Sequence, residues 1–289
     1  YEFLDWKRQV LGVEEEESFC ACSNSYIERD TKVAASSYIE DSYIYSGTAV
    51  GENCVISAVT LRGEEIPAHT AMHGLKQKDG SFVVRVYGVN DNPKGRLEDH
   101  APFLGGTLAS FLEAAGLKAE EVWEQEGHYL WNAKLYPVCA TIEEAVKAGA
   151  ELLKLAAGEK KYAESYRAAR RMSLQESFEN ADVKEIVAWQ AKLGTQVRIA
   201  RFLLALEQRK SVEEAGAVFG SQGITPSQVE KLRKIAETSE FGIRMRIYYY
   251  LSKITKGQVS EELENQCFRY ICDSLYEASI GEAPKDEAY

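Results

Sequence analysis

Residues 25–61, SYIERDTKVAASSYIEDSYIYSGTAVGENCVISAVTL, decide the fold, because this stretch repeats itself. The tripeptide Ser-Tyr-Ile occurs at residues 25–27, 37–39 and 42–44, and NCVI at residues 53–56 is a fourth version. Apolar residues form three series with a common spacing of 17, namely Cys22, Ile39 and Ile56; Ile27, Ile44 and Leu61; and Val33 and Val50. Within each period they lie five or six positions apart, which is typical of a parallel β-helix with three short strands per coil. The sequence therefore predicts about two and a half coils between about residues 20 and 68.

After Pro67 the pattern changes to that of a hairpin. Two β-rich runs, MHGLKQ and SFVVRVYGV, flank KDGS, in which the pair Asp79-Gly80 predicts a two-residue turn. Beyond it, TLASFLEAAG (residues 107–116) predicts a short amphipathic helix, and YLWNAKLYPV (129–138) predicts a strand. We assign residues 1–140 to a first domain that consists of the β-helix, the hairpin and a mixed extension.

From Thr141 onward the signals are helical. Capping boxes occur at Thr141 with Glu144, Ser173 with Glu176 and Ser211 with Glu214, and Asp182 with Glu185 is a variant. A 3.6-residue apolar period predicts one long helix over residues 183–209, and Thr225-Pro226 starts another, followed by periodic runs over 240–255 and 260–279. Short loops between such helices favour antiparallel packing. The predicted fold class is thus α+β and multidomain, with an all-α domain over residues 141–289.

Composition excludes several classes of protein. The chain has 34 basic and 45 acidic residues and a net charge of -11, so it offers no basic stripe for nucleic acid or an anionic membrane surface. No segment approaches the roughly 20 apolar residues of a membrane span, and the start of the chain has no signal-peptide core, so we expect a cytoplasmic protein. Six cysteines without CxxC spacing indicate reduced thiols. The chain starts without methionine, and we interpret it as a segment of a longer polypeptide.

Catalytic motifs are missing from the sequence. It contains no GxxxxGK[ST], GxGxxG, HExxH or GxSxG pattern. His69 and His73 are four residues apart but lie in a strand-and-turn region, and the acidic run at residues 14–17 is interpreted as a solvated face, so we predict no metal site. The segment GVNDNPKG (88–95) has the composition of a phosphate- or sugar-binding loop and equally that of a plain Asn-Pro turn, and both interpretations stay open.

Three segments, RVYGVNDNPKG (85–95), LWNAKLYPVC (130–139) and RRMSLQESFENAD (170–182), carry a resemblance to a known family. In sequence and order they resemble the bacterial bifunctional L-fucokinase/GDP-fucose pyrophosphorylase family, and the likeness runs from about residue 20 to about residue 210. In sugar-nucleotide pyrophosphorylases of this kind, similar coils follow the nucleotidyltransferase domain and are left-handed. The resemblance therefore implies a left-handed parallel β-helix, a hand that the spacing alone leaves open.

The resemblance also implies what the parent enzyme does. Such enzymes make fucose 1-phosphate from fucose and ATP, and then transfer a guanylyl group from GTP, with Mg²⁺, to give GDP-L-fucose and pyrophosphate. The glycine-rich loops for both steps are absent from this sequence, so we expect a nucleotidyltransferase domain upstream and a kinase domain downstream in the same polypeptide. We expect the segment itself to hold no cofactor or metal, to supply no catalytic residue and to be inactive alone. Its expected role is a scaffold, with a possible homo-oligomer interface on the flat coil faces.

Eight residues in the matching segments are candidates for one wall of a sugar pocket. They are Arg85, Asn90, Asp91, Asn92, Lys94, Trp131, Asn132 and Lys134. By family likeness, Lys94 or Arg85 would pair with a sugar phosphate, Asp91 would accept sugar hydroxyls, and Trp131 would pack on an apolar sugar face. The alternative for Trp131 is a strand residue that is buried beneath the helical half.

Two other classes of function remain open. One is a hexapeptide-repeat acyltransferase, in which coenzyme A lies between neighbouring β-helices and a histidine acts as general base. The short repeat, the lack of a histidine at a mid-coil corner and the acidic composition argue against it. The other is a protein-interaction module, in which the helical half presents a groove to one partner.

Overall fold

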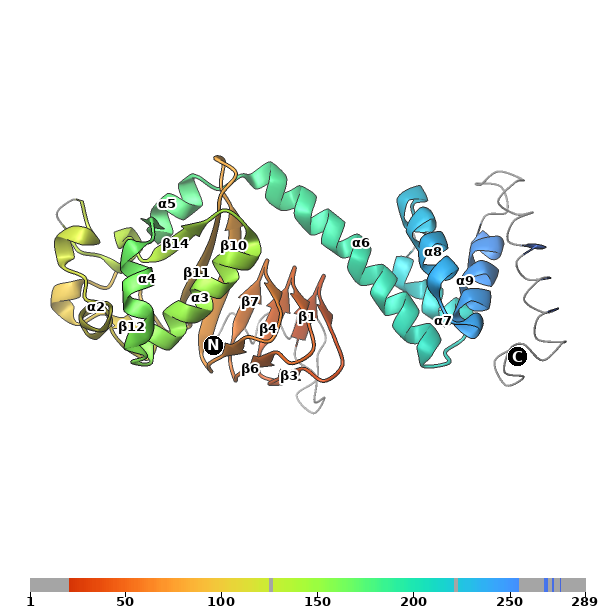
Figure 1. Ribbon diagram of the computed structural model, residues 1–289, viewed down its shortest axis with the longest axis horizontal. Helices are drawn as coiled ribbons and strands as arrows, with labels where there is room; N and C mark the ends of the chain where they lie inside the picture. The colour runs from red at the N-terminus through yellow and green to blue at the C-terminus, as the bar shows by residue number, and fades with distance from the viewer. Residues whose placement is uncertain are drawn as a thin grey trace. The chain divides into compact units, whose positions relative to one another are not determined.

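The computed structural model describes residues 21–124, 127–220 and 223–254, together with residues 268, 269, 272 and 276. The described chain forms two compact units, which divide between Gly194 and Thr195. The first unit holds the β-strands and the second is built from helices (Figure 1). The predicted helix over residues 260–279 lies outside the described residues except at the four isolated positions, and the acidic run at residues 14–17 also lies outside them.

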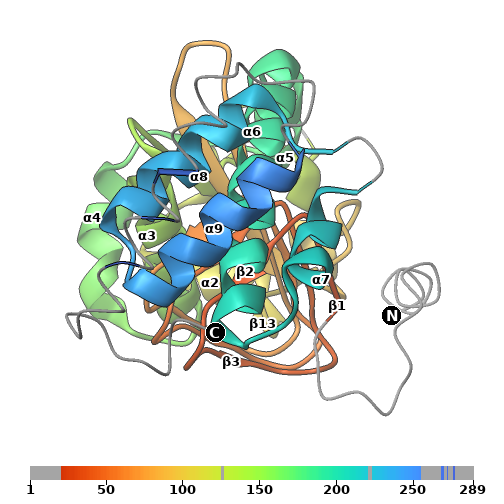
Figure 2. The same ribbon diagram turned by 90° about the vertical axis from the view of Figure 1, so that its right-hand side faces the viewer.

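The first unit begins with a parallel β-solenoid of about three coils, as the repeat predicts. Each coil gives one strand to each of three sheets, so β1, β2 and β3 lie on different sides of the first coil (Figure 2). The strands are β1 (Ala21–Ser23), β4 (Tyr38–Glu40) and β7 (Val55–Ser57); β2 (Tyr26–Ile27), β5 (Tyr43–Ile44) and β8 (Thr60–Leu61); and β3 (Lys32–Val33), β6 (Ala49–Val50) and β9 (Glu65–Ile66). The pairing between coils is parallel throughout these strands.

Strand register confirms the three predicted ladders. Ile27 pairs with Ile44, and Ile44 pairs with Leu61. The series through Ile39 and through Val50 are aligned in the same way. Ile44 and Leu61 are completely buried, because the side chains of neighbouring coils stack on one another in the solenoid interior.

The serine of the repeated tripeptide has a role that the sequence analysis did not identify. The Ser25 Oγ accepts a hydrogen bond from the Ser42 amide at 3.0 Å, and the Ser42 Oγ accepts one from the Val59 amide at 3.2 Å. The Ser37 Oγ accepts from the Cys54 amide at 2.9 Å. All three serines are buried. Each hydroxyl therefore satisfies a buried amide of the next coil, which would otherwise be costly to desolvate.

The hairpin that follows the coils is β10 (Thr70–Lys76) and β11 (Phe82–Gly88), paired antiparallel as predicted. Its turn is longer than the predicted two residues. The Gln77 amide donates to the Ser81 carbonyl at 2.8 Å and the Gly80 amide donates to the Gln77 carbonyl at 2.9 Å, which leaves three residues in the loop. Gly80 has a φ of 85°, a left-handed conformation that suits glycine and lets the chain enter the second strand after the extra residue.

The hairpin joins the first solenoid sheet, which reaches seven strands in the order β1-β4-β7-β10-β11-β14-β15. The strand predicted over residues 129–138 forms only at its end, as β14 (Tyr136–Cys139), because Leu130–Asn132 adopt a 3-10 turn, η3. The short strand β15 (Arg171–Met172) interrupts the predicted all-helical region. It forms where the chain passes the edge of β14 and pairs antiparallel with it.

Helix α3 (Ile142–Ala156) packs on the inner side of this sheet and contacts the last coil as well as β10, β11 and β14 (Figure 1). The predicted capping box of Thr141 and Glu144 starts the helix. Gly149 allows its close approach, because a Cβ there would lie 3.0 Å from a methyl group of Val86. The helix thus supplies the cover that an isolated short solenoid lacks.

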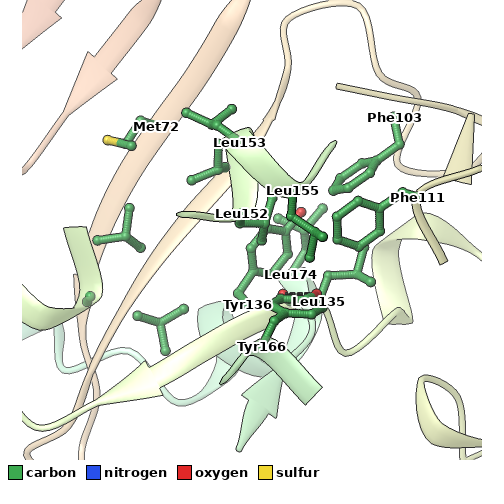
Figure 3. Packing of buried hydrophobic residues seen from close by; sticks show 14 of the residues in the cluster. Met72, Phe103, Phe111, Leu135, Tyr136, Leu152, Leu153, Leu155, Tyr166 and Leu174 are labelled. Atoms are coloured by element: carbon green, nitrogen blue, oxygen red, sulfur yellow. Dashed lines mark hydrogen bonds between the residues drawn. The ribbon is translucent and has the colours of Figure 1, made fainter. Parts of the chain in front are cut away.

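A compact aromatic core lies beyond α3 (Figure 3). The ring of Phe111, in the predicted helix α2 (Leu108–Ala115), lies edge-on to Phe103 and Tyr166 with centroid distances of 5.0 and 5.6 Å. The buried Tyr166 hydroxyl donates to the Leu135 carbonyl at 2.6 Å. Around this core lie β12 (Pro102–Phe103), β13 (Gly106–Thr107), α4 (Ala163–Ala168), α5 (Leu174–Glu179) and the 3-10 turns η1 (Leu97–Asp99), η2 (Ala119–Glu121) and η4 (Lys160–Tyr162).

Helix α6 (Val183–Glu207) confirms the long helix that the sequence predicts and runs from the first unit into the second. The second unit continues with α7 (Val212–Gly216), η5 (Ala217–Phe219), α8 (Pro226–Thr238) and α9 (Phe241–Ile254). Its core contains three aromatic rings, those of Phe202, Phe219 and Tyr250, with centroids 4.8–5.7 Å apart. Among the described residues, no helix combines the length and apolar composition needed to cross a bilayer.

Candidate functional site

The structure distributes the eight predicted residues over three places in the first unit. Four of them lie in the loop that follows β11, where the carboxylate of Asp91 accepts hydrogen bonds from the amides of Gly88 at 2.6 Å and Leu104 at 3.1 Å. Burial raises the pKa of Asp91, and these two backbone donors oppose the shift. The carboxylate therefore holds the loop in shape. Asn90 is exposed at the start of the turn.

Two backbone hydrogen bonds attach this loop to the 3-10 turn η3. The Leu130 amide donates to the Gly95 carbonyl at 2.9 Å, and the Trp131 amide donates to the Pro93 carbonyl at 2.8 Å. Leu130 is fully buried and anchors the turn in the core. Because of this attachment, segments that lie more than thirty residues apart in sequence form one surface.

A pocket of about 690 Å³ opens on that surface, and we call it the Trp131 pocket. Its lining residues are Pro93, Lys94, Tyr129, Trp131, Asn132 and Gln175. The expectation that Trp131 is buried beneath the helical half is wrong, because its side chain is 39% exposed, and that of Tyr129 is 41% exposed. The reason is that Leu130, and not Trp131, points into the core from this turn.

Polar groups of the Trp131 pocket are only partly engaged by the protein. The Asn132 Nδ2 donates to the Gly127 carbonyl at 3.0 Å, whereas its buried Oδ1 has no partner among the described residues. Asn92 lies beside the pocket, and its Oδ1 accepts from the Lys94 amide at 3.0 Å. Lys94 is exposed. The pocket therefore combines two aromatic surfaces and one cation, a combination suited to a polyhydroxylated ligand with a negative charge.

Lys134 does not contribute to the Trp131 pocket. Its ammonium group pairs with the carboxylates of Glu124 and Glu176, the latter at 3.3 Å. The hydrogen bond to Glu124, followed by the charge of Glu176, raises the pKa of Lys134. The two carboxylates hold this lysine in an ion-pair network close to β14.

Arg85 lies elsewhere, in a second pocket of about 830 Å³ that we call the sheet groove. The sheet groove runs along the outer face of β4, β7, β10 and β11, and residues of α5 and α6 form its rim. Arg85 is 8% exposed, and its Nη2 lies 2.5 Å from the Nδ1 of His73, its direct neighbour across the hairpin. Because arginine only donates, the neutral His73 ring carries its proton on Nε2.

Electrostatics in the sheet groove favour a neutral histidine. Burial, together with the charge of Arg85, lowers the pKa of His73 from 6.5 to about 4, while Glu40 opposes the shift. Burial also lowers the pKa of Arg85. The guanidinium has no carboxylate partner among the described residues, and its buried Nε has no hydrogen-bond partner among them.

Sequence reasoning missed several of the residues that form these pockets. Tyr129 begins the predicted strand over residues 129–138 and Gln175 lies in the resembling segment 170–182, but neither was selected as a candidate. In the sheet groove, Glu40 and Ser57 gave a signal that was not used, because they are spaced by 17 like the ladders and each follows a ladder residue. In the described part of the chain, no cluster of three His, Cys, Asp or Glu side chains has the geometry to hold a metal ion.

The known proteins that this chain resembles all have names that refer to fucose-1-phosphate guanylyl transfer or to GDP-fucose pyrophosphorylase. Residues 2–141 match the fucose pyrophosphorylase domain. Human fucose-1-phosphate guanylyltransferase is 26% identical over 192 residues, which cover 62% of this chain and 31% of the human protein. The mouse guanylyltransferase is 27% identical over 198 residues, or 64% of this chain and 33% of that protein.

A third relative is named as a bifunctional enzyme. The bifunctional fucokinase/GDP-fucose pyrophosphorylase of Arabidopsis thaliana is 31% identical over 98 residues, which cover 32% of this chain and 9% of that protein. The chain thus spans about a third of the length of the two guanylyltransferases that it matches. No solved structure matches it significantly.

Proposed function

We propose that this chain is a non-catalytic segment of a fucose-1-phosphate guanylyltransferase, because its residues 2–141 match the fucose pyrophosphorylase domain. The complete enzyme would transfer the guanylyl group of GTP to fucose 1-phosphate and release pyrophosphate. The attacking sugar phosphate and the leaving pyrophosphate must lie in line at the α-phosphorus, and Mg²⁺ and basic side chains must stabilise the charge. This sequence has no glycine-rich phosphate loop for that task. We therefore assign the transfer to a nucleotidyltransferase domain upstream, and an ATP-dependent fucokinase domain downstream completes the proposed arrangement.

A scaffold is the role that the fold supports best. One continuous hydrophobic core extends from the coils through β10 and β11 to α2 and α3, so the first unit is a rigid body on which other domains can be held. Helix α6 is 25 residues long, roughly 37 Å at the usual rise per residue, and its residues up to Gly194 belong to this unit. The flanking domains are the proposed partners, and a homo-oligomer along the flat coil faces is a further proposal.

The Trp131 pocket is the proposed contribution of this segment to sugar binding. The observation that carries this assignment is the exposure of the Trp131 and Tyr129 rings beside Lys94. An aromatic face can pack on the apolar face of a sugar, and Lys94 is placed to attract its phosphate. These features favour the pyrophosphorylase interpretation over the acyltransferase alternative.

The test is pyrophosphate release from GTP and fucose 1-phosphate with Mg²⁺, measured with this chain alone and with the chain joined to its native upstream segment. We expect activity only from the longer protein. In that protein, Trp131→Ala should raise KM for fucose 1-phosphate by about tenfold, since one well-packed aromatic contact contributes about 1.4 kcal/mol. Tyr249→Ala is the matched control, because Tyr249 is also an exposed aromatic residue but lines neither the Trp131 pocket nor the second pocket around Arg85.

Three results would contradict the proposal. Activity of the short chain alone would overturn its non-catalytic role. Silence of the longer protein, when circular dichroism shows both to be folded, would instead favour the interaction-module alternative. An unchanged KM in Trp131→Ala would remove the Trp131 pocket from sugar binding and leave the scaffold role in place.

A further inference from the structure

The sheet groove contains a row of polar side chains that the proposed function does not use. Strand register aligns Glu40 with Ser57, Ser57 with His73 and His73 with Arg85, so the four side chains follow one another across four neighbouring strands. Hydrogen bonds join the row at both ends, from the Ser57 Oγ to the Glu40 Oε1 at 3.0 Å and between Arg85 and His73. At about 4.8 Å per strand, its acidic and basic ends are roughly 14 Å apart.

Each carboxylate that lines the sheet groove accepts a hydrogen bond within the protein, whereas Arg85 is buried without a counter-ion in direct contact among the described residues. Asp41 accepts hydrogen bonds from Asn24 at 2.6 Å and from Gln190 at 2.7 Å. At the rim, the Asp182 carboxylate accepts from the Glu185 amide at 3.1 Å and the Glu179 carboxylate accepts from Gln175 at 2.9 Å. Arg85, by contrast, has His73 as its hydrogen-bond partner and no ion pair among the described residues. A buried cation without a counter-ion is costly, and an anion bound in the sheet groove would remove this cost.

We propose that the sheet groove binds the phosphate group of a small phosphorylated polyol, with Arg85 and His73 as the phosphate ligands. The planar guanidinium presents several donors in fixed directions, which matches a phosphate. The His73 Nε2–H adds one more donor. At the rim the charges of Lys78 and Lys184 are offset by those of Glu179 and Asp182, so the attraction for an anion comes from Arg85. Towards the other end, Glu40, Ser57 and Gln190 offer acceptors and donors for hydroxyl groups.

The dimensions of the sheet groove agree with a ligand of this class. A volume of about 830 Å³ exceeds what a lone phosphate needs and lies within the usual range of small-molecule sites. The choice of a sugar phosphate as the polyol rests on the proposed function, whereas the phosphate site itself does not. Binding can therefore be measured on this chain without any guanylyl transfer.

The experiment is isothermal titration calorimetry of the full chain with L-fucose 1-phosphate, inorganic phosphate, free L-fucose and acetate. We expect fucose 1-phosphate to bind, inorganic phosphate to compete with it more weakly, and fucose and acetate to give no signal in the same concentration range. Arg85→Gln should weaken the affinity for fucose 1-phosphate by about tenfold or more, because a charge-assisted hydrogen-bond pair is lost. Arg85→Lys should be intermediate, since it keeps the charge and loses the planar fork.

Matched controls separate this site from general charge and from the Trp131 pocket. Arg170→Gln makes the same change at an exposed arginine outside the sheet groove and should leave the affinity within about twofold, since exposed charges are screened. The Trp131 pocket is the other proposed site for fucose 1-phosphate, so the wild type should show two binding events; Trp131→Ala should remove one and keep the event in the sheet groove, and Arg85→Gln should do the reverse. If Trp131→Ala abolished binding and Arg85→Gln did not, the phosphate site would be in the other pocket and this proposal would be overturned.

A stability measurement keeps the proposal testable if a variant is poorly behaved. Without ligand, Arg85→Met should be no less stable to urea than the wild type, because it removes a buried charge that no carboxylate of the described residues offsets. A lower urea midpoint would show that Arg85 is a structural residue and would contradict a ligand role. Absence of fucose 1-phosphate and phosphate binding to the wild type at millimolar concentration would overturn the proposal outright.

Discussion

Truncation of Ile44 to alanine tests the stacked-coil core directly. Ile44 is completely buried in the middle coil, between Ile27 on one side and Leu61 on the other. Truncation of a buried isoleucine costs about 2–5 kcal/mol, and the higher values apply where the surroundings cannot relax into the cavity. Hydrogen-bonded neighbours on both sides fix the coil spacing, so we expect Ile44→Ala to lower the free energy of unfolding of the first unit by about 3–4 kcal/mol.

The matched control is Ile27→Ala, the same substitution in the first coil. Ile27 is only half-buried, and among the described residues its ladder neighbour is Ile44 alone. A less enclosed site loses less contact and relaxes more easily, so we expect a loss of about 1–2 kcal/mol. The difference of about 2 kcal/mol between two identical substitutions is the quantity that depends on stacking.

Urea denaturation followed by tryptophan fluorescence measures both values. Trp123, Trp131 and Trp189 lie in the first unit and the sequence has no tryptophan beyond Trp189, so the signal reports the first unit. Parallel circular dichroism at 222 nm, which is dominated by helices, should show a helical transition that the two substitutions leave largely in place. A loss below about 1 kcal/mol for Ile44→Ala, or equal losses for the two variants, would refute the stacked-coil argument.

Two further predictions concern close packing and pH. Gly74→Ala should cost about 2–3 kcal/mol, because a Cβ at Gly74 would lie 2.2 Å from the Ala58 carbonyl oxygen and backbone cannot move aside easily. Its control, Gly149→Ala, would place a Cβ 3.0 Å from a Val86 methyl group instead of 2.2 Å from backbone, and it gains helix propensity, so a thermal melt should show a clearly smaller decrease in melting temperature. His73 has a lowered pKa of about 4, so the unfolded chain binds its proton at higher pH than the folded chain does. The contribution of His73 to the free energy of unfolding is therefore fully present above about pH 6.5 and decreases as the pH falls towards 4. Between pH 7 and pH 5 the free energy of unfolding should fall by about 2 kcal/mol. Urea midpoints at the two pH values should differ less for His73→Gln than for the wild type, and equal differences would contradict this assignment.

The sequence predicts the coils well because their physics is local and periodic. A spacing of 17 residues fixes which side chains stack, so the sequence alone aligns Ile27 with Ile44 and Ile44 with Leu61, as the strand register confirms. Capping boxes predict helix starts for a similar reason, since donor and acceptor lie three residues apart. The predicted length of the hairpin turn was wrong, because Asp-Gly occurs both in two-residue and in three-residue turns. Only the strand register, which pairs Lys76 with Phe82, distinguishes the two turn lengths.

The candidate site was predicted only in part because it is assembled by tertiary contacts. Lys94, Trp131 and Asn132 do meet in one pocket, as members of two segments that the resemblance had selected. What joins them is a pair of backbone hydrogen bonds, such as that from Leu130 to Gly95, and backbone groups leave no mark on residue type. Arg85 was selected with these residues because it lies nearby in sequence, but alternation along β11 directs it to the sheet groove.

The same repeat that builds the core also builds the polar row of the sheet groove. Successive residues of a strand point to opposite faces, so each residue after a ladder aliphatic lies on the outer face. Ile39 is therefore followed by Glu40, Ile56 by Ser57 and Met72 by His73, and the period of the core aligns their polar neighbours on adjacent strands. Substitutions in this outer row change the charge of the sheet groove without disturbing the stacked aliphatics. The scaffold and the ligand preference of the sheet groove can thus vary independently on one fold, which is why the groove has to be tested at Arg85 and the core at Ile44.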